Sequence, residues 1–170
     1  MHQPPCDTRQ RWLRPGEQGA CEAVLRSVPE WFGIESSLQN YVAKAAELPT
    51  VVAEVGIGLT PGSPDTAGSI VGFLTIAQHF PESGEVYCLA VRREFHRGGI
   101  GRALVGFAAN WLASRGARWL QVKTMGPSKP NAEYAQTLRF YRACGFDPLE
   151  EIHGLWGTIP CLVLVKRIGS

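Results

Sequence analysis

Residues 86–110 read VYCLAVRREFHRGGIGRALVGFAAN, and this stretch decides the fold. Its first part, Val86 to Val91, is an apolar run that predicts a strand, and a basic loop with Gly98, Gly99 and Gly101 follows. The apolar residues after the loop recur at helical spacing: Ile100, Leu104, Phe107, Ala108, Trp111 and Leu112. N–H groups at the start of such a helix, together with the helix dipole, favour an anion, and glycine allows a phosphate to approach the backbone closely. The stretch therefore predicts a strand, a loop and a helix that bind a phosphate-bearing ligand.

The composition is typical of a soluble globular protein. The chain has 170 residues, of which 45% are hydrophobic and 19% are charged, and this size suits a single domain over residues 1–170. A net charge of +2 without a basic run does not indicate a nucleic-acid partner. No apolar stretch reaches the ~20 residues of a membrane span and no signal peptide is recognised, so we expect a cytoplasmic protein without a membrane partner.

The cysteines and histidines indicate neither a disulfide framework nor a metal site. The five cysteines are scattered and contain no C-x-x-C pair: Cys6, Cys21, Cys88, Cys144 and Cys161. We expect reduced thiols, as in cytoplasmic proteins. The four histidines lack the spacing of metal ligands, so no metal is expected.

The rest of the chain predicts two leading helices followed by strands and helices. The expected strands cover residues 8–13, 50–56, 69–77, 86–91, 117–125, 146–152 and 161–168, and the expected helices cover 17–27, 36–48, 100–114 and 132–144. Ser36 followed by Gln39 predicts a capping box at the second helix. The Gly/Pro-rich residues 56–68 predict an exposed hairpin connection. This order predicts an α/β fold of the α+β type, in which helices cover a mixed sheet.

Two motifs in these elements resemble the GNAT superfamily of acyl-CoA-dependent N-acyltransferases, and the resemblance covers the chain from about residue 17. The family's phosphate signature R/Q-x-x-G-x-G/A falls on residues 96–101, with His96 in place of the usual Arg or Gln. The segment LRFYRACGF, residues 138–146, contains Tyr141 in the family's pattern Y-x-x-x-G-F, although Tyr134 and Thr137 replace an Asn and an Ala common upstream. A Rossmann fold fits less well, because no acidic residue follows the glycines at the required distance.

The resemblance implies a fold, a co-substrate and a set of contacts. The fold is a mostly antiparallel sheet with central parallel, splayed strands flanked by helices, and the co-substrate is acetyl-CoA. Pantetheine is expected to pair with the end of the central strand at Leu89, Ala90 and Val91. The pyrophosphate is expected at the loop, whose residues are His96, Arg97, Gly98, Gly99, Ile100, Gly101 and Arg102. Arg92 and Arg93 also lie around this loop, where each arginine can face either the phosphates or the solvent.

Acetyl transfer to an amine requires a base for the amine and an acid for the departing thiolate, each worth about 10²–10⁴ in rate. Tyr141 is the candidate acid, because a phenol with a pKa of ~10 stays protonated at neutral pH and the resemblance places a Tyr near the thioester. Glu85, at the start of the central strand, resembles the catalytic Glu of histone-acetylating members and is expected to act through a water. His79 is the alternative base, because an imidazole titrates near neutral pH. Cys144 could suggest an acyl-enzyme, but a buried core thiol is expected instead.

The acceptor is the least defined part of the prediction. Glu30, Trp31 and Phe32, expected in a joint between the two leading helices, are candidates for binding it, because they offer a carboxylate and aromatic faces to an amine. The same residues could simply form a hydrophobic hinge. We expect a monomeric or homodimeric N-acetyltransferase acting on a small-molecule primary amine. The alternatives are a protein lysine or N-terminal acetyltransferase and a non-catalytic acyl-CoA-binding sensor.

Overall fold

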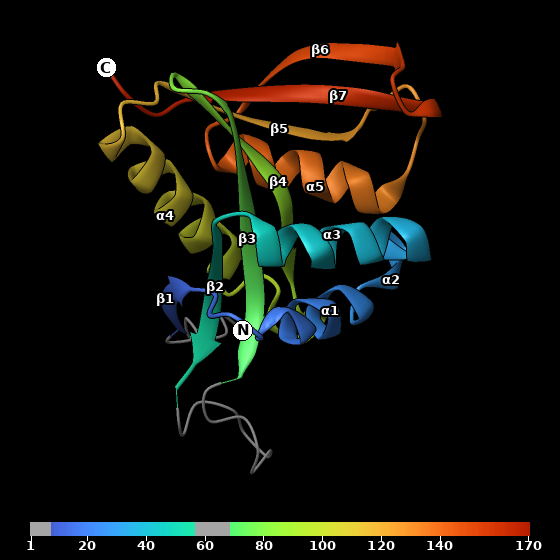
Figure 1. Ribbon diagram of the computed structural model, residues 1–170. Helices are drawn as coiled ribbons and strands as arrows, with labels where there is room; N and C mark the ends of the chain where they lie inside the picture. The colour runs from blue at the N-terminus through green and yellow to red at the C-terminus, as the bar shows by residue number, and fades with distance from the viewer. Residues whose placement is uncertain (1–7, 57–68) are drawn as a thin grey trace. The chain divides into compact units, whose positions relative to one another are not determined.

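The computed structural model describes residues 8–56 and 69–170 as a seven-stranded mixed sheet with flanking helices (Figure 1). The strands are β1 Thr8–Trp12, β2 Thr50–Val55, β3 Ile70–Phe80, β4 Ser83–Val91, β5 Trp119–Met125, β6 Asp147–Gly154 and β7 Gly157–Arg167. The helices are α1 Gln18–Arg26, α2 Pro29–Phe32, α3 Glu35–Glu47, α4 Ile100–Ser114 and α5 Ala132–Ala143, and the short 3-10 helix η1 is Arg93–Phe95. None of the helices in this part of the chain is long and apolar enough to cross a membrane.

The strand order in the sheet is β1-β2-β3-β4-β5-β7-β6. β4 and β5 run parallel, whereas β1 with β2, β2 with β3, β5 with β7 and β6 with β7 are antiparallel. The parallel register of β4 and β5 covers four residue pairs, from Ser83–Trp119 to Val86–Val122. This mixed sheet confirms the fold class predicted from the sequence.

The chain forms two compact units that alternate along the sequence. The first unit contains the described residues up to Ile76 together with Cys88–Ala108, and the second contains Ala77–Tyr87 and Ala109–Ser170. In the first unit, α1, α2 and α3 pack together (Figure 1), and Phe73, Leu74, Val51 and Leu25 are fully buried. In the second unit, α5 packs along β5 (Figure 1), and Leu112, Leu120, Phe146 and Leu164 are fully buried.

Most predicted elements are confirmed, and the differences have local causes. Residues 30–33 were predicted to form a joint between two helices, but Pro29–Phe32 form the short helix α2. Pro29 begins this helix, because the φ angle of proline suits the first helical residue. The predicted capping box at Ser36 is wrong. α3 begins at Glu35, whose carboxylate binds Gln39 and Arg26, and Ile34 at the N-cap provides no side-chain hydrogen bond. The predicted hairpin connection over residues 56–68 lies outside the described residues except for Gly56.

Arg11 joins three elements of the first unit. Its guanidinium, 12% exposed, binds Glu17 before α1 at 2.7 Å and Glu54 on β2 at 3.1 Å, while it projects from β1. The hydrogen bonds from Arg11 lower the pKa of the Glu17 carboxyl below its ordinary value. β1 therefore attaches to both α1 and β2 through a single cation, in addition to its backbone pairing.

We predict that Arg11→Met lowers the free energy of unfolding near neutral pH by about 1–3 kcal/mol, because two charge-assisted hydrogen-bonded pairs are lost. Since the folded-state pKa of Glu17 is depressed, its contribution is present above the unfolded value of ~4.3 and is lost as the pH falls below it. The difference in the free energy of unfolding between wild type and Arg11→Met should therefore be smaller near pH 3 than near pH 7, as measured by urea unfolding. Arg9→Met is the control, since Arg9 is exposed on the same strand, and an equal loss there would contradict the assignment.

Candidate active site

The loop between β4 and α4, in the first unit, presents unused backbone donors. Arg97 and Gly99 have left-handed backbones, with φ of 63° and 81°, and these turns lead the chain into α4. The first hydrogen bond of α4 runs from the Ala103 N–H to the Gly99 carbonyl, 3.0 Å away. The amides of Ile100, Gly101 and Arg102 have no backbone acceptor among the described residues. Three N–H groups at a helix N-terminus are therefore available to an anion.

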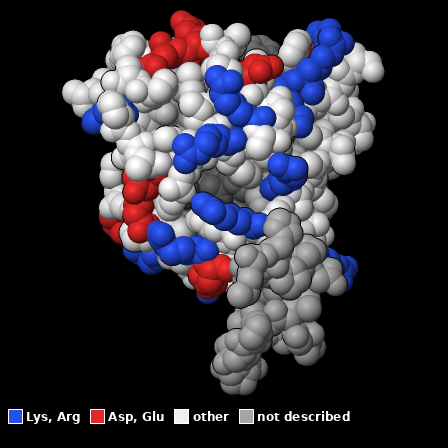
Figure 2. Space-filling view, turned by 180° about the vertical axis from the view of Figure 1, so that it is seen from behind, with Lys and Arg blue, Asp and Glu red and all other residues white. Residues whose placement is uncertain are grey.

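Cationic groups accompany these amides. The Nε atom of Arg92 is buried and has no hydrogen-bond acceptor among the described residues, a condition that costs free energy until an acceptor arrives. Figure 2 shows several Lys and Arg side chains around a hollow on the face that it displays. An added Cβ at Gly99 would meet no atom within 4 Å, so the surface above this residue is open. These observations fit the phosphates of an acyl-CoA.

The end of β4 lies next to the same loop. Ala90 is buried, whereas Leu89 and Val91 are partly exposed, as alternation along a strand requires. A Cβ at Gly72 of β3 would come within 3.1 Å of the Ala90 carbonyl oxygen, so this glycine permits β3 and β4 to lie close together. Nε2 of His96 lies 2.7 Å from the Val91 carbonyl oxygen and donates a hydrogen bond to it. His96, which replaces the usual Arg or Gln of the motif, therefore attaches the loop to the end of β4.

Two of the three residues predicted to bind the acceptor contact the loop between β4 and α4. Glu30 forms an ion pair with Arg93 at 2.5 Å, and Arg93 lies over the Trp31 ring, 6.0 Å from its centroid. Trp31 also packs edge-on against His96, with ring centroids 6.0 Å apart. Phe32 instead packs against Tyr41 of α3. α2 is thus attached to the loop by charge and aromatic contacts, and its acceptor role stays a prediction.

The second unit brings together Glu85 and His79. Glu85 is the third residue of β4 and is 7% exposed, and its Oε2 atom lies 2.5 Å from Nε2 of His79 near the end of β3. The same oxygen accepts a hydrogen bond from Nζ of Lys123 on β5, at 2.9 Å. The imidazole of His79 is about half exposed, at 49%, whereas the side chain of Glu85 is 9% exposed. Of the two predicted bases, His79 is therefore the one open to solvent.

Lys123 was missed by the sequence analysis, although it left a signal. Lys123 is a cation in the interior of the predicted strand ARWLQVKTM, and a charge that is buried in a strand needs a partner. Glu85 pairs with Gln121 in the parallel register, so Lys123, two residues further along β5, lies on the same face. The partner could not be identified from the sequence, because 38 positions separate Lys123 from Glu85.

Tyr141, also in the second unit, is buried near the end of α5 and is 6% exposed. Its ring packs edge-on against Phe140 and Phe146, with centroids 5.1 Å and 5.4 Å away. Cys144, one turn later, is buried as well, and Lys166 donates a hydrogen bond to its carbonyl oxygen. Tyr141 thus has a fixed ring position, and its role as an acid stays a prediction.

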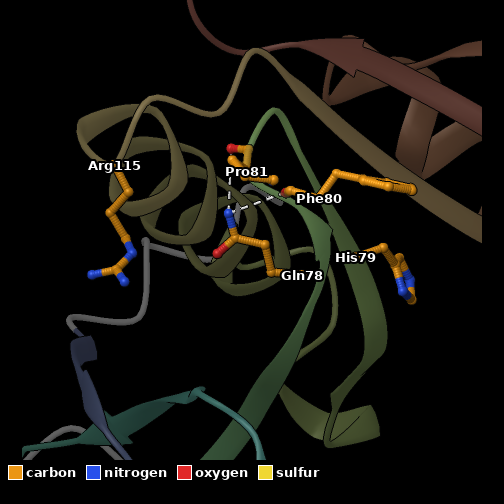
Figure 3. A pocket seen from close by; sticks show the side chains of 5 residues that line it. All are labelled: Gln78, His79, Phe80, Pro81 and Arg115. Carbon is orange, nitrogen blue, oxygen red and sulfur yellow. Dashed lines mark hydrogen bonds between the residues drawn. The ribbon is translucent and has the colours of Figure 1, made fainter.

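An open depression in the second unit lies beside the end of β3 (Figure 3). It is lined by Gln78, His79, Phe80, Pro81 and Arg115. The Gln78 amide donates hydrogen bonds to the carbonyl oxygens of Phe80 and Pro81, and the His79 ring points away from Gln78 and Arg115 (Figure 3). The Gln78 amide is therefore already engaged by backbone carbonyls, and the Nε2 atom of His79 contacts Glu85.

Neither a metal cluster nor a reactive thiol is found in residues 8–56 and 69–170. No group of three or more potential ligands gathers there, and the four cysteines in these ranges are buried and form no disulfide. Burial raises the pKa of Cys21 to about 12 and also raises the pKa of Cys88 and Cys161. These three thiols are therefore protonated near neutral pH, and the described site consists of oxygen and nitrogen groups.

Comparisons with known proteins agree with this geometry. A protein from Desulfovibrio desulfuricans, described as a GNAT-family acetyltransferase, superposes with a TM-score of 0.74 at 18% identity, over 95% of this chain and 99% of the other. The ribosomal-protein-S18-alanine N-acetyltransferase of Escherichia coli gives 0.69 at 16% identity, over 96% and 95%. An aminoglycoside 6'-N-acetyltransferase complexed with coenzyme A gives 0.66 at 18% identity, over 94% and 97%.

These identities establish a shared fold, and no curated protein sequence matches the chain. The family itself follows from the sequence: residues 49–148 match the family model described as the acetyltransferase (GNAT) domain. The matched segment contains β2 to α5, including Glu85, Tyr141 and the phosphate loop. The chain therefore belongs to the GNAT family of acetyltransferases and is an acetyl-CoA-dependent acyltransferase.

Proposed function

We propose that this protein is an N-acetyltransferase that moves an acetyl group from acetyl-CoA to a primary amine of a small molecule by direct attack. The observation that carries the proposal is the left-handed loop at Arg97–Gly99, which opens α4 with three unused amides inside the family segment. The acetyl thioester supplies an activated acyl group. The chain supplies anion binding, a base and an acid. The two units act as one domain of 170 residues, since β3, β4 and α4 pass through both units.

In the proposed site the loop binds the pyrophosphate, and the end of β4 at Leu89, Ala90 and Val91 pairs with pantetheine. The open amides after Gly99 and the buried Nε of Arg92 support this assignment. Neither feature depends on a side chain of residues 96–101, so His96 is compatible with pyrophosphate binding by this loop. Backbone donors at a helix N-terminus bind an anion without the conformational entropy cost of ordering long side chains.

Base action comes from the pair formed by Glu85 and His79, and Tyr141 acts as the acid. Support for the base is the hydrogen bond between the two side chains, 2.5 Å long. Support for the acid is the position of Tyr141 in the matched pattern and its fixed ring. A phenol gives its proton to the sulfur as negative charge develops there.

For the acceptor, the proposal favours a small amine bound near α2, in the cytoplasm. Glu30 and Trp31 offer a carboxylate and an aromatic face, both used by ammonium groups. A protein lysine or N-terminus is the competing acceptor class. A non-catalytic acyl-CoA sensor is the competing function, and it would bind the co-substrate without turnover.

We predict that Gly99→Ala raises the Kd for coenzyme A roughly tenfold, because a left-handed backbone costs Ala about 1–2 kcal/mol and the loop shifts to relieve it. Gly106→Ala is the matched control. Gly106 lies inside α4 with no atom within 4 Å of an added Cβ, so Ala should leave the Kd unchanged and stabilise the helix by about 0.5–1 kcal/mol. Isothermal titration calorimetry measures the Kd. Equal affinities of the two variants would contradict the loop assignment.

We also predict that the wild-type protein releases thiol from acetyl-CoA with at least one amine in a panel of polyamines, amino acids, aminoglycosides and peptides. Tyr141→Phe should lower kcat about 10²–10⁴-fold with an unchanged Kd for coenzyme A, because only the proton donor is removed. Tyr134→Phe on the same helix is the control and should retain activity. Binding of coenzyme A without turnover of any amine would favour the sensor, and an unchanged kcat in Tyr141→Phe would remove Tyr141 as the acid.

A further inference from the structure

The contacts of Glu85 distinguish the roles of Glu85 and His79 in the proposed base function. Oε2 of Glu85 lies 2.5 Å from Nε2 of His79 and 2.9 Å from Nζ of Lys123. An ammonium group can only donate a hydrogen bond, so Oε2 is the acceptor from Lys123, and a carboxylate oxygen in contact with His79 accepts from a ring N–H. Nε2 of His79 therefore carries the hydrogen in the contact with Glu85.

This arrangement makes Glu85 unsuitable as the direct base. Its side chain is 9% exposed and its Oε2 is already occupied by two donors. Glu85 therefore lacks the access to solvent and the free Oε2 that direct attack on an amine proton requires.

His79 offers an unoccupied nitrogen and an exposed side chain. With the hydrogen on Nε2, the neutral ring keeps a lone pair on Nδ1, and no described residue binds Nδ1. The side chain of His79 is 49% exposed, so it is open to solvent, unlike that of Glu85. A carboxylate that fixes the tautomer of an imidazole and stabilises the imidazolium during the reaction is the arrangement found in hydrolase triads.

Lys123 completes the arrangement. Its ammonium group donates to the same Oε2 atom that contacts His79, so the buried carboxylate has a cationic partner besides the imidazole. Cys161 of β7 also interacts with Lys123 and Glu85, but burial raises the pKa of its thiol, which therefore adds no charge near neutral pH.

We infer that His79 is the proton acceptor of the acetyl transfer, that Glu85 positions it, and that Lys123 holds the Glu85 carboxylate in place. This inference rests on the proposed function. As the amine nitrogen bonds to the acetyl carbon, it loses one proton to Nδ1 of His79. The carbon–sulfur bond breaks with its electron pair on sulfur, and Tyr141 donates a proton to that sulfur. Water returns the proton from His79 to Tyr141, so the net products are the amide and the free thiol.

The test compares His79→Ala with His153→Ala, using an amine that the wild type acetylates. His153 is exposed on β6, 3.7 Å from the Glu151 carboxylate, and is therefore a matched histidine without an assigned role. We expect His79→Ala to lower kcat about 10²–10⁴-fold with an unchanged Kd for coenzyme A, and added imidazole to restore part of the rate. His153→Ala should stay within about twofold of wild type. Full activity of His79→Ala, or loss without rescue by imidazole, would overturn the inference.

Lys123 is tested by whether another cation at its position restores the rate. Lys123→Met removes one of the two donors to Oε2 of Glu85 and should lower kcat with an unchanged Kd for coenzyme A, whereas Lys123→Arg keeps a donor and should stay near the wild-type kcat. Equal kcat values of Lys123→Met and wild type would overturn the assignment of Lys123.

A measurement on the resting protein separates the inference from the proposed function. In ¹⁵N-labelled wild type, with His79→Ala used to assign the signals, we expect a protonated Nε2 and an unprotonated Nδ1 on His79. A hydrogen on Nδ1 would overturn the inference even if amines are acetylated. Absence of turnover despite coenzyme A binding and the expected tautomer would instead contradict the proposed function.

Discussion

A carboxylate buried in a sheet must be compensated by donors that the fold places beside it, and Glu85 imposes this constraint on the second unit. Removing an ionised group from water costs several kcal/mol unless it is paired and hydrogen-bonded. Lys123 can compensate Glu85 because the register of β4 and β5 places Glu85 opposite Gln121, which puts Lys123 on the same face. A register one residue different would point the lysine to the other face. The charge arrangement of the candidate base therefore depends on the one parallel pair that the described strand registers contain.

The parallel pair in turn requires α4, because parallel neighbours need a long crossover connection. α4 thus has two roles along the chain. Its first residues, after the left-handed backbones of Arg97 and Gly99, present the unused amides, and its last turn leads the chain into β5. The helix that provides the proposed phosphate site is the same helix that sets the direction of the strand bearing Lys123. This dependence explains why residues 86–110 contain so much of the information about the fold.

The sequence was sufficient for features that depend on local pattern and not for those that depend on pairing. Apolar periodicity located the strands and the long helices, and the glycine spacing located the loop before α4. The helix α2 was missed because a proline can end or begin a helix, and only packing decides which. The capping box failed because Glu35 is held by Arg26 of α1, a contact that the local pattern at Ser36 does not contain. Glu85 and His79 were identified by residue type, whereas their shared partner Lys123 depends on strand register.

His96 shows how a departure from a motif can be compensated within the fold. The side chain donates to the Val91 carbonyl oxygen through one ring nitrogen, which a guanidinium or an amide could also do. An imidazole is shorter and has a flat aromatic face, and Trp31 of α2 packs against that ring. Glu30, adjacent to Trp31, binds Arg93 on the same side of the loop. Because α2 supplies both contacts, the loop has a second support that does not depend on an Arg or Gln at position 96. The His96 side chain bonds to Val91 and leaves the backbone amides of Ile100, Gly101 and Arg102 without a backbone acceptor, so the proposed anion site does not depend on the residue at position 96.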